Sequence, residues 1–241
     1  IGLPGVTALI EHHKILYQDL LNPVGFFKGV EETQLSKFWP YVFGGGMDLK
    51  SSEVEKYSDL MSESQHLVAA DTLAAVNIPS VCRFLDVGGG KGTFVSELKK
   101  IYPKVDAAVF DLPGSHSETS GHRCIIGSFK EDELPAGYDI ISLVRILYDH
   151  RDETIRDLLS KTYSALDKGG RLIVSEPMLG ADRPTLWGDV YFAMYTLAMS
   201  TGKTRSPDQV SEFIKDAGFS NVTIHKSARP FITTVIEARK T

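Results

Sequence analysis

Hydrophobic and polar positions form two different patterns along the chain. In the first third, apolar residues recur every three or four positions, which is the spacing of amphipathic helices. Helices are predicted over residues 6–20, 33–41 and 52–76. From residue 81 onward, short β-rich runs alternate with helical stretches. The pattern predicts a helical segment over residues 1–80 and an α/β domain over residues 81–241.

The second part alternates strands and helices in the way that is typical of a doubly wound sheet. Strands are predicted over residues 81–87, 105–110, 123–126, 138–147, 171–175, 222–225 and 231–238. Helices are predicted over residues 91–101 and 152–166, and a third begins at Ser206, an N-cap that Pro207 follows. The run over 138–147 is apolar almost throughout, as in a parallel strand buried on both faces. Helical crossovers of this length imply a parallel sheet, and the last two runs are predicted to pair antiparallel.

The composition excludes several classes of function. The 241 residues carry 26 Lys and Arg against 31 Asp and Glu, a net charge of −5, which argues against nucleic acid as a partner. No run approaches the roughly 18 apolar residues of a membrane-spanning helix and no signal peptide is apparent, so we expect a cytoplasmic location. Cys82 and Cys124 are too few for a disulfide framework, and we expect reduced thiols and no metal site. Because the first residue is Ile1 rather than Met, we expect the chain to be part of a longer protein.

A glycine-rich loop follows the first predicted strand and opens a helix. Its sequence is DVGGGKGT over residues 86–93, and the glycines let the backbone turn tightly and let a ligand approach the main chain. Thr93 stands where a dinucleotide-binding G-x-G-x-x-G motif has its third glycine. Asp86, directly before the glycines, would repel a pyrophosphate. The loop therefore disfavours a nucleotide-dependent reductase and predicts a ligand without phosphate.

A second acidic residue, Asp111, ends the next predicted strand. A carboxylate in this place accepts hydrogen bonds from both hydroxyls of a ribose. Together with Asp86 it suits S-adenosylmethionine, a nucleoside that is cationic at sulfur and carries no phosphate. In the alternative interpretation, Asp86 only caps the glycine loop and Asp111 only caps the turn over residues 112–114.

Several stretches, in this order and spacing, resemble the S-adenosylmethionine-dependent O-methyltransferases that include the plant caffeic acid enzymes. They are FLDVGGGKGTF, VFDLP, DIISLVRILYDHRDE, KGGRLIVSEPM and RSPDQVSEFIKDAGF. The stretches PGVTALIEHHKILYQDL, LYDH, SEPM, GDVYFAMYTLAM and ARPFITTVI are similar to the carotenoid branch of that family, the bacterial demethylspheroidene or hydroxyneurosporene O-methyltransferases. The resemblance covers essentially the whole chain.

The resemblance implies a Rossmann-like sheet of seven strands, mostly parallel with an antiparallel last strand. It implies cofactor contacts at Asp86, Gly88, Gly90, Asp111, Leu112, Ser128, Phe129 and Arg145. Residues 1–80 then form a helical linker that lines the substrate pocket and is the remnant of an N-terminal dimerisation region. The family predicts a homodimer for the full-length protein and leaves the state of this shorter chain open.

The predicted catalytic residues depart from the plant pattern. Where plant members have a histidine as general base, this chain has Tyr148, followed by Asp149 and His150. Glu176 matches the family glutamate that orients the base, and the position of a second glutamate falls near Thr204. We expect Tyr148, Glu176 and, as the runner-up base, His150 to form the catalytic group. Asp149 is expected to cap the helix that begins near residue 152.

The acceptor is expected to be a hydrophobic small molecule with a hydroxyl group, such as a hydroxylated carotenoid. A tertiary alcohol is too weakly acidic to lose its proton beforehand, so its proton leaves with or after methyl transfer and Tyr148 serves chiefly to position it. The aromatic and methionine-rich run over residues 187–199 is predicted to line the pocket, with Asp189 orienting the hydroxyl; its alternative is a buried core helix. Because such a substrate is strongly apolar, we expect the protein to contact a membrane surface transiently.

Three other functions stay open at this point. The first is a methyltransferase for a phenolic or polyketide product, and the second is a relative that methylates tetrapyrroles. The third is a protein that binds S-adenosylmethionine without catalysis.

Overall fold

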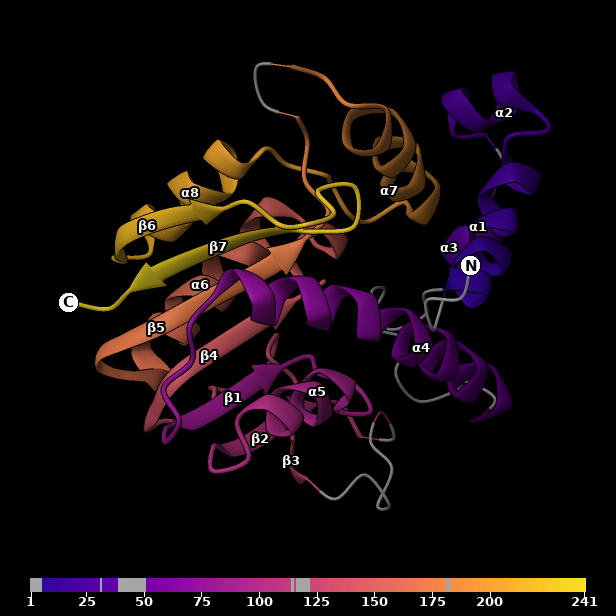
Figure 1. Ribbon diagram of the computed structural model, residues 1–241. Helices are drawn as coiled ribbons and strands as arrows, with labels where there is room; N and C mark the ends of the chain where they lie inside the picture. Colours follow the sequence, from indigo (N-terminus) through magenta and orange to yellow (C-terminus); the bar gives the residue numbers. More distant parts are fainter. Residues whose placement is uncertain (1–5, 31, 39–50, 114, 116–121, 181–182) are drawn as a thin grey trace.

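The first four helices precede the sheet. The computed structural model describes residues 6–30, 32–38, 51–113, 115, 122–180 and 183–241 (Figure 1). The helices are α1 (Val6–Asp19), α2 (Pro23–Lys28), α3 (Gln34–Phe38) and α4 (Ser51–Ala75). Three of them agree with the predicted helices, although residues 39–41 of the second prediction lie outside the described residues. The additional helix α2 forms because the side chain of Asn22 accepts a hydrogen bond from the amide of Gly25 and Pro23 occupies the first turn.

Seven strands form one sheet, which confirms the predicted fold class. They are β1 (Arg83–Val87), β2 (Asp106–Asp111), β3 (Arg123–Ile126), β4 (Tyr138–Val144), β5 (Leu166–Glu176), β6 (Ser220–His225) and β7 (Thr234–Arg239). Their order is β3-β2-β1-β4-β5-β7-β6, and β1 to β5 are parallel. β7 runs antiparallel to both of its neighbours.

Helices cover both faces of the sheet and create two separate cores. The connecting helices are α5 (Thr93–Ile101), α6 (Asp152–Ala165) and α8 (Pro207–Asp216). Successive residues of a strand point to opposite faces, so Ile140 of β4 packs in the core with Phe94 of α5, whereas Ile141 packs in the core with Leu158 of α6. Burial on both faces explains why the sequence of β4 is apolar almost throughout.

Strand β5 is longer than predicted. The four residues 167–170 have turn composition and lie between the predicted helix over 152–166 and the predicted strand over 171–175, yet β5 begins at Leu166. The amide of Gly169 donates to the carbonyl of Lys240, and the amide of Lys240 donates to the carbonyl of Gly170, both at 2.9 Å. The pairing with the C-terminal residues therefore extends the strand through a segment whose composition alone indicates a turn.

A third, smaller core lies at the carboxyl ends of the parallel strands. In Figure 1 the arrows of β1 and β5 point toward the side of the molecule where α1 and α7 (Ala193–Met199) lie. The buried members of this core are Leu16, Phe26, Leu35, Tyr148, Tyr195, Ala198 and Met199. α7 continues a π-helix, Leu186–Phe192, and such helices are frequent at functional sites. Among the described helices, none combines the length and the apolar character needed to span a bilayer.

Candidate active site

The glycine loop lies at the point where the order of the strands reverses. β1 is paired with β2 on one side and with β4 on the other, and ligands of such sheets bind outside the carboxyl end at this point. Gly88 and Gly90 have φ values of +71° and +55°, a conformation that side chains rarely adopt. A side chain at Gly90 would meet no atom within 4 Å, so the backbone is open to a ligand there.

Asp111 closes one side of this loop. One oxygen of its carboxylate accepts a hydrogen bond from the amide of Gly90, and the other accepts one from the amide of Leu112, both at 2.6 Å. The structure therefore brings together three of the predicted cofactor contacts, Gly90, Asp111 and Leu112. Each carboxylate oxygen accepts more than one hydrogen bond, so these bonds are compatible with further bonds from ribose hydroxyls.

Asp86 lies beneath the loop and is 1% exposed. Its Oδ1 accepts a hydrogen bond from the hydroxyl of Ser142 at 2.5 Å, and its Oδ2 has no hydrogen-bond partner among the described residues. Burial raises the pKa of Asp86 to about 7, against the hydrogen bond from Ser142, and Asp111 raises it further. An under-bonded carboxylate of this kind suits a cationic ligand, because a positive charge would favour its ionised form.

Arg145 adopts a left-handed conformation, φ +60°, directly after β4. This conformation is unusual for a residue with a side chain and is most often retained at functional sites. Its Nη1 donates to the hydroxyl of Ser64 on α4 at 2.8 Å. Burial raises the pKa values of Tyr148 and Asp149, and the charge of Arg145 opposes part of this shift, so the guanidinium lies near the predicted catalytic turn.

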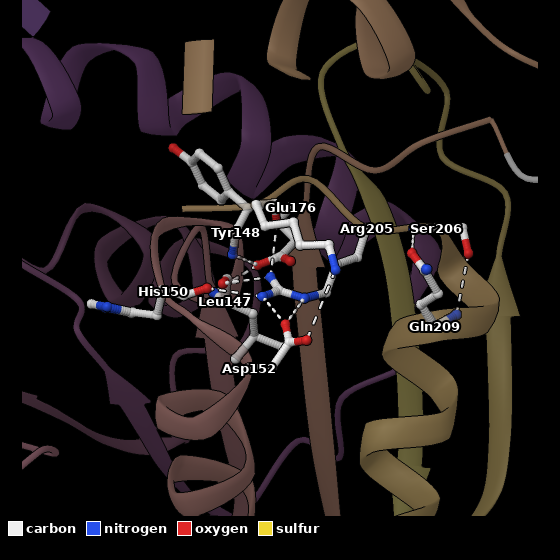
Figure 2. Close-up of polar contacts among 9 residues, drawn as sticks. Leu147, Tyr148, His150, Asp152, Glu176, Arg205, Ser206 and Gln209 are labelled. Atoms are coloured by element: carbon white, nitrogen blue, oxygen red, sulfur yellow. Dashed lines mark hydrogen bonds and ion pairs between the residues drawn. The ribbon is translucent and has the colours of Figure 1, made fainter. Parts of the chain in front are cut away.

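The remaining predicted contacts lie on the far side of that turn. The amide of Ser128 donates to the carboxylate of Asp132 at 2.8 Å. The ring of Phe129 packs edge-on against the imidazole of His150, with 5.3 Å between the ring centroids. Figure 2 shows the side chains of His150 and Tyr148 pointing in different directions. The structure thus brings His150 to Phe129 and not to the hydroxyl of Tyr148.

Glu176 binds the backbone of the turn that carries Tyr148. This turn is a short 3-10 helix, Leu147–Asp149. The Oε2 atom of Glu176 accepts hydrogen bonds from the amides of Leu147 at 2.9 Å and Tyr148 at 3.3 Å. Burial raises the pKa of Glu176 to about 7, while the charge of Arg205 and the backbone bonds oppose this shift. Glu176 therefore orients the turn as a whole rather than the phenol group.

Arg205 holds the same turn from its carbonyl side and was not predicted from the sequence. It is 2% exposed, and its guanidinium donates to the carbonyls of Leu147 at 3.2 Å and His150 at 2.9 Å (Figure 2). It also donates to the carboxylate of Asp152 at 2.5 and 3.0 Å. The only nearby sequence signal is the capping box of Ser206 and Gln209, which marks the start of α8 but gives no role to the preceding arginine.

The turn itself presents two buried polar side chains, Tyr148 and Asp149. They are 2% and 6% exposed. Burial raises the pKa of the Tyr148 phenol far above its usual range, so the phenol stays neutral. Burial also raises the pKa of Asp149 well above its usual value, against the charge of Arg145, and its Oδ1 has no hydrogen-bond partner among the described residues. The sequence pattern predicted only a helix cap at Asp149.

Two histidines of α1 complete the walls of this region. The Nε2 atom of His12 lies 2.6 Å from the hydroxyl of Tyr195, and His13 contacts the hydroxyl of Tyr191. Burial and the charge of Arg145 lower the pKa values of His12 and His13 to about 3 and 4, so both imidazoles are neutral. Nothing in the local sequence connects α1 to residues about 180 positions later, and this contact was not predicted.

The aromatic run over residues 187–199 divides between interior and surface. Tyr195, Ala198 and Met199 are buried in the core that contains Tyr148, whereas Trp187, Val190 and Leu197 are exposed. Asp189 lies in the π-helix. Its Oδ2 atom accepts hydrogen bonds from the amides of Gly180 at 2.8 Å and Thr185 at 2.6 Å. Asp189 therefore stabilises the start of the π-helix through this oxygen, and its role in orienting an acceptor hydroxyl stays a prediction.

Comparison with known proteins identifies the family to which the chain belongs. Residues 17–220 match the model of the O-methyltransferase domain. Demethylspheroidene O-methyltransferase of Rhodobacter capsulatus is 46% identical in sequence, and the match covers the whole of this chain and 62% of the relative. The protein of the same name from Cereibacter sphaeroides is 43% identical, and the match covers 99% of this chain and 65% of the relative. Human N-acetylserotonin methyltransferase, solved in complex with SAM, is 25% identical with a TM-score of 0.76, over 94% of this chain and 66% of that one. The chain thus spans a little under two thirds of the length of the two bacterial relatives, and it belongs to the O-methyltransferase family.

Proposed function

We propose that the chain is the catalytic part of an S-adenosylmethionine-dependent O-methyltransferase. The observation that carries this proposal is the pair of carboxylates, Asp86 and Asp111, on either side of an open glycine loop at the switch point of the sheet. A phosphate-free nucleoside with a cationic sulfur suits this pair, whereas a pyrophosphate would be repelled. The human relative that was solved with SAM has the same fold.

S-adenosylmethionine supplies an electrophilic methyl group when it is bound. The chain's own residues then have three tasks. Asp111 and the backbone of Gly90 hold the ribose side, Asp86 and Arg145 provide charges near the polar end, and the turn with Tyr148 faces the acceptor. Fixing the acceptor oxygen and the methyl group in line removes most of the entropic barrier of such a transfer.

The acceptor is a hydroxylated carotenoid. Two lines of support are the names of the two relatives at 46% and 43% identity and the apolar, aromatic core around Tyr148. In this proposal the linker, residues 1–80, contributes the wall formed by Leu16, Phe26 and Leu35. Exposed apolar side chains, among them Leu186 and Trp187, support transient contact with a membrane surface from which such a substrate is taken. Homodimerisation of the full-length protein stays a prediction.

The test is methyl transfer with a labelled methyl group. We expect transfer to an extracted hydroxylated carotenoid and little transfer to a small flat phenol. Transfer to the phenol alone would assign the chain to the phenolic class, and binding of S-adenosylhomocysteine without transfer to either acceptor would indicate a non-catalytic protein. Calorimetry with S-adenosylhomocysteine and with NADH serves as the control for the cofactor, and tight binding of NADH would contradict the proposal.

A further inference from the structure

One carboxylate oxygen in the candidate active site stands out because it is buried and under-bonded. Asp149 is 6% exposed, and its Oδ1 lacks a hydrogen-bond partner among the described residues. A buried, unsatisfied carboxylate destabilises a protein, and such groups are retained chiefly where they have a function. Asp149 follows Tyr148 in the turn at the carboxyl end of β4, the end at which ligands of this sheet bind.

The proposed reaction releases a proton that none of the predicted residues is suited to accept. In methyl transfer to an alcohol, a C–O bond forms, the C–S bond breaks with its electron pair remaining on sulfur, and the acceptor oxygen gives up its proton. The phenol of Tyr148 is neutral and already protonated. His150 packs on Phe129 with its side chain directed away from Tyr148, and Glu176 is engaged by the amides of Leu147 and Tyr148 (Figure 2).

We propose that Asp149 is the proton acceptor of the methyl transfer, in place of the histidine that the plant enzymes carry at position 148. This inference rests on the proposed function. It assigns a role to the free Oδ1 atom, and it explains why the loss of a histidine at position 148 is tolerated. Tyr148, the preceding residue in the same turn, then positions the acceptor hydroxyl.

The charges around Asp149 make its protonation state responsive to a bound cation. The groups that face it are Arg145 at the end of β4, Tyr148 in the same turn and Glu176 at the end of β5. Segment 200–205 also packs against the turn, since the amide of Lys203 donates to the carbonyl of Tyr148. Lys203 and Arg205 form ion pairs with Asp152, and Arg205 also donates to the carbonyls of Leu147 and His150. Since burial raises the pKa of Asp149 and Arg145 offsets only part of this effect, burial favours the protonated carboxyl group, and an added positive charge favours ionisation.

This arrangement keeps the net charge of the site constant during the reaction. Before transfer, a positive sulfur is balanced by an ionised Asp149. After transfer, sulfur is neutral and the carboxyl group has taken the proton of the acceptor oxygen, so no charge is left without a partner in a buried site. The charge balance therefore predicts proton release when S-adenosylmethionine binds, and this release can be measured without an acceptor.

The test compares proton release on binding of S-adenosylmethionine and of S-adenosylhomocysteine, which differ by the methyl group and the charge on sulfur. Calorimetry at pH 7 in two buffers of different ionisation enthalpy gives the number of protons released. We expect S-adenosylmethionine to release at least about half a proton more per chain than S-adenosylhomocysteine. We expect this difference to vanish in Asp149→Asn and to persist in Glu153→Gln, a matched change at an exposed carboxylate four positions along the chain.

Infrared difference spectroscopy of the wild-type chain provides a second measurement that needs no variant. The carbonyl stretch of a protonated carboxyl group should decrease when S-adenosylmethionine binds and should not change with S-adenosylhomocysteine. For turnover, Asp149→Asn should lose about a hundredfold or more in kcat, while its affinity for S-adenosylhomocysteine stays within a few-fold of wild type.

Equal proton release with both ligands would overturn the inference, as would an Asp149→Asn variant that turns over at the wild-type rate. Loss of S-adenosylhomocysteine binding in that variant would assign Asp149 to the fold instead. These outcomes are separate from those of the proposed function, because proton release is measured without acceptor. A chain that shows the release but methylates no carotenoid would retain Asp149 as the proton acceptor for another alcohol or phenol.

Discussion

Glu176 and Arg205 hold opposite sides of one three-residue turn. Glu176 accepts hydrogen bonds from the amides of Leu147 and Tyr148, and Arg205 donates to the carbonyls of Leu147 and His150. The two side chains are 1% and 2% exposed. Because Glu176 and Arg205 bind the backbone on both sides, the position of Tyr148 and Asp149 depends on these two residues.

Replacing Arg205 should therefore affect both stability and turnover. We expect Arg205→Ala to lower the free energy of unfolding by about 3 kcal/mol, since it leaves buried carbonyls unsatisfied, and to lower kcat more than the affinity for S-adenosylhomocysteine. Arg156→Ala is the matched control, because Arg156 forms an exposed ion pair with Asp216 and should contribute at most about 1 kcal/mol. Urea unfolding and steady-state kinetics measure the two effects. Equal losses in both variants would argue against a positioning role for Arg205.

The ribose side of the candidate site is tested by Asp111→Ala. Removing this carboxylate leaves the amides of Gly90 and Leu112, and any ribose hydroxyls, without their acceptor, so we expect the affinity for S-adenosylhomocysteine to fall about tenfold to a hundredfold. Asp106→Ala removes an exposed carboxylate from the other end of the same strand and should leave the affinity unchanged. Calorimetric titration compares them. Unchanged affinity in Asp111→Ala would place the cofactor elsewhere.

The variant Tyr148→Phe distinguishes a role in positioning the acceptor from a role in binding the cofactor. Loss of the hydroxyl should lower kcat about tenfold to a hundredfold with little change in cofactor affinity, since the phenol lies beside Arg145 and Asp149 rather than at the glycine loop. The control is Tyr138→Phe, which removes a buried hydroxyl that accepts from Arg123 at 2.9 Å, away from the site. A loss of affinity with unchanged kcat would move the reacting group to another residue.

Asp86→Asn tests the pH dependence of stability. The pKa of Asp86 is raised from 3.8 to about 7, so between these values the folded chain holds a proton that the unfolded chain has released. Protonation of Asp86 thus stabilises the fold at low pH, and this contribution is lost as the pH rises toward 7. Relative to Asp86→Asn, the wild type should lose up to about 4 kcal/mol between pH 4 and pH 8.

Urea unfolding at a series of pH values provides the measurement. Relative to Glu176→Gln, the wild type should also lose stability as the pH rises, but by a smaller amount, because the pKa of Glu176 is raised only from 4.5 to about 7. If the difference in the free energy of unfolding between wild type and Asp86→Asn does not depend on pH, the buried and under-bonded state of Asp86 is contradicted. A difference that shifts in favour of the wild type as the pH rises contradicts it as well.

The sequence predicted those features that local pattern determines. The nearly continuous apolar run of β4 and the capping box at Ser206 placed strands and helices near their observed bounds, and the glycine loop marked the switch point. It did not predict the extension of β5 through residues 167–170, because that pairing depends on Lys240 at the other end of the domain.

The polar contacts of the candidate site were predicted less well, because they too join residues that are far apart in the sequence. The guanidinium of Arg205 reaches carbonyls more than fifty positions away, and Asp149 looks in the sequence like an ordinary helix cap. For Asp189, residue type and helix spacing do not reveal that one carboxylate oxygen accepts hydrogen bonds from the amides of Gly180 and Thr185. Burial and hydrogen-bond satisfaction are properties of the assembled fold.

His12 of α1 contacts Tyr195 in α7, and His13 contacts Tyr191 in the π-helix that precedes α7. None of these four residues lies in a strand of the sheet. Under the proposed function, an exchange of α1 together with residues 186–199, between relatives with different acceptors, should therefore transfer acceptor selectivity without a change in the glycine loop. An exchange of α1 alone, or of residues 186–199 alone, would remove one partner from both contacts, so these segments are expected to diverge as a unit.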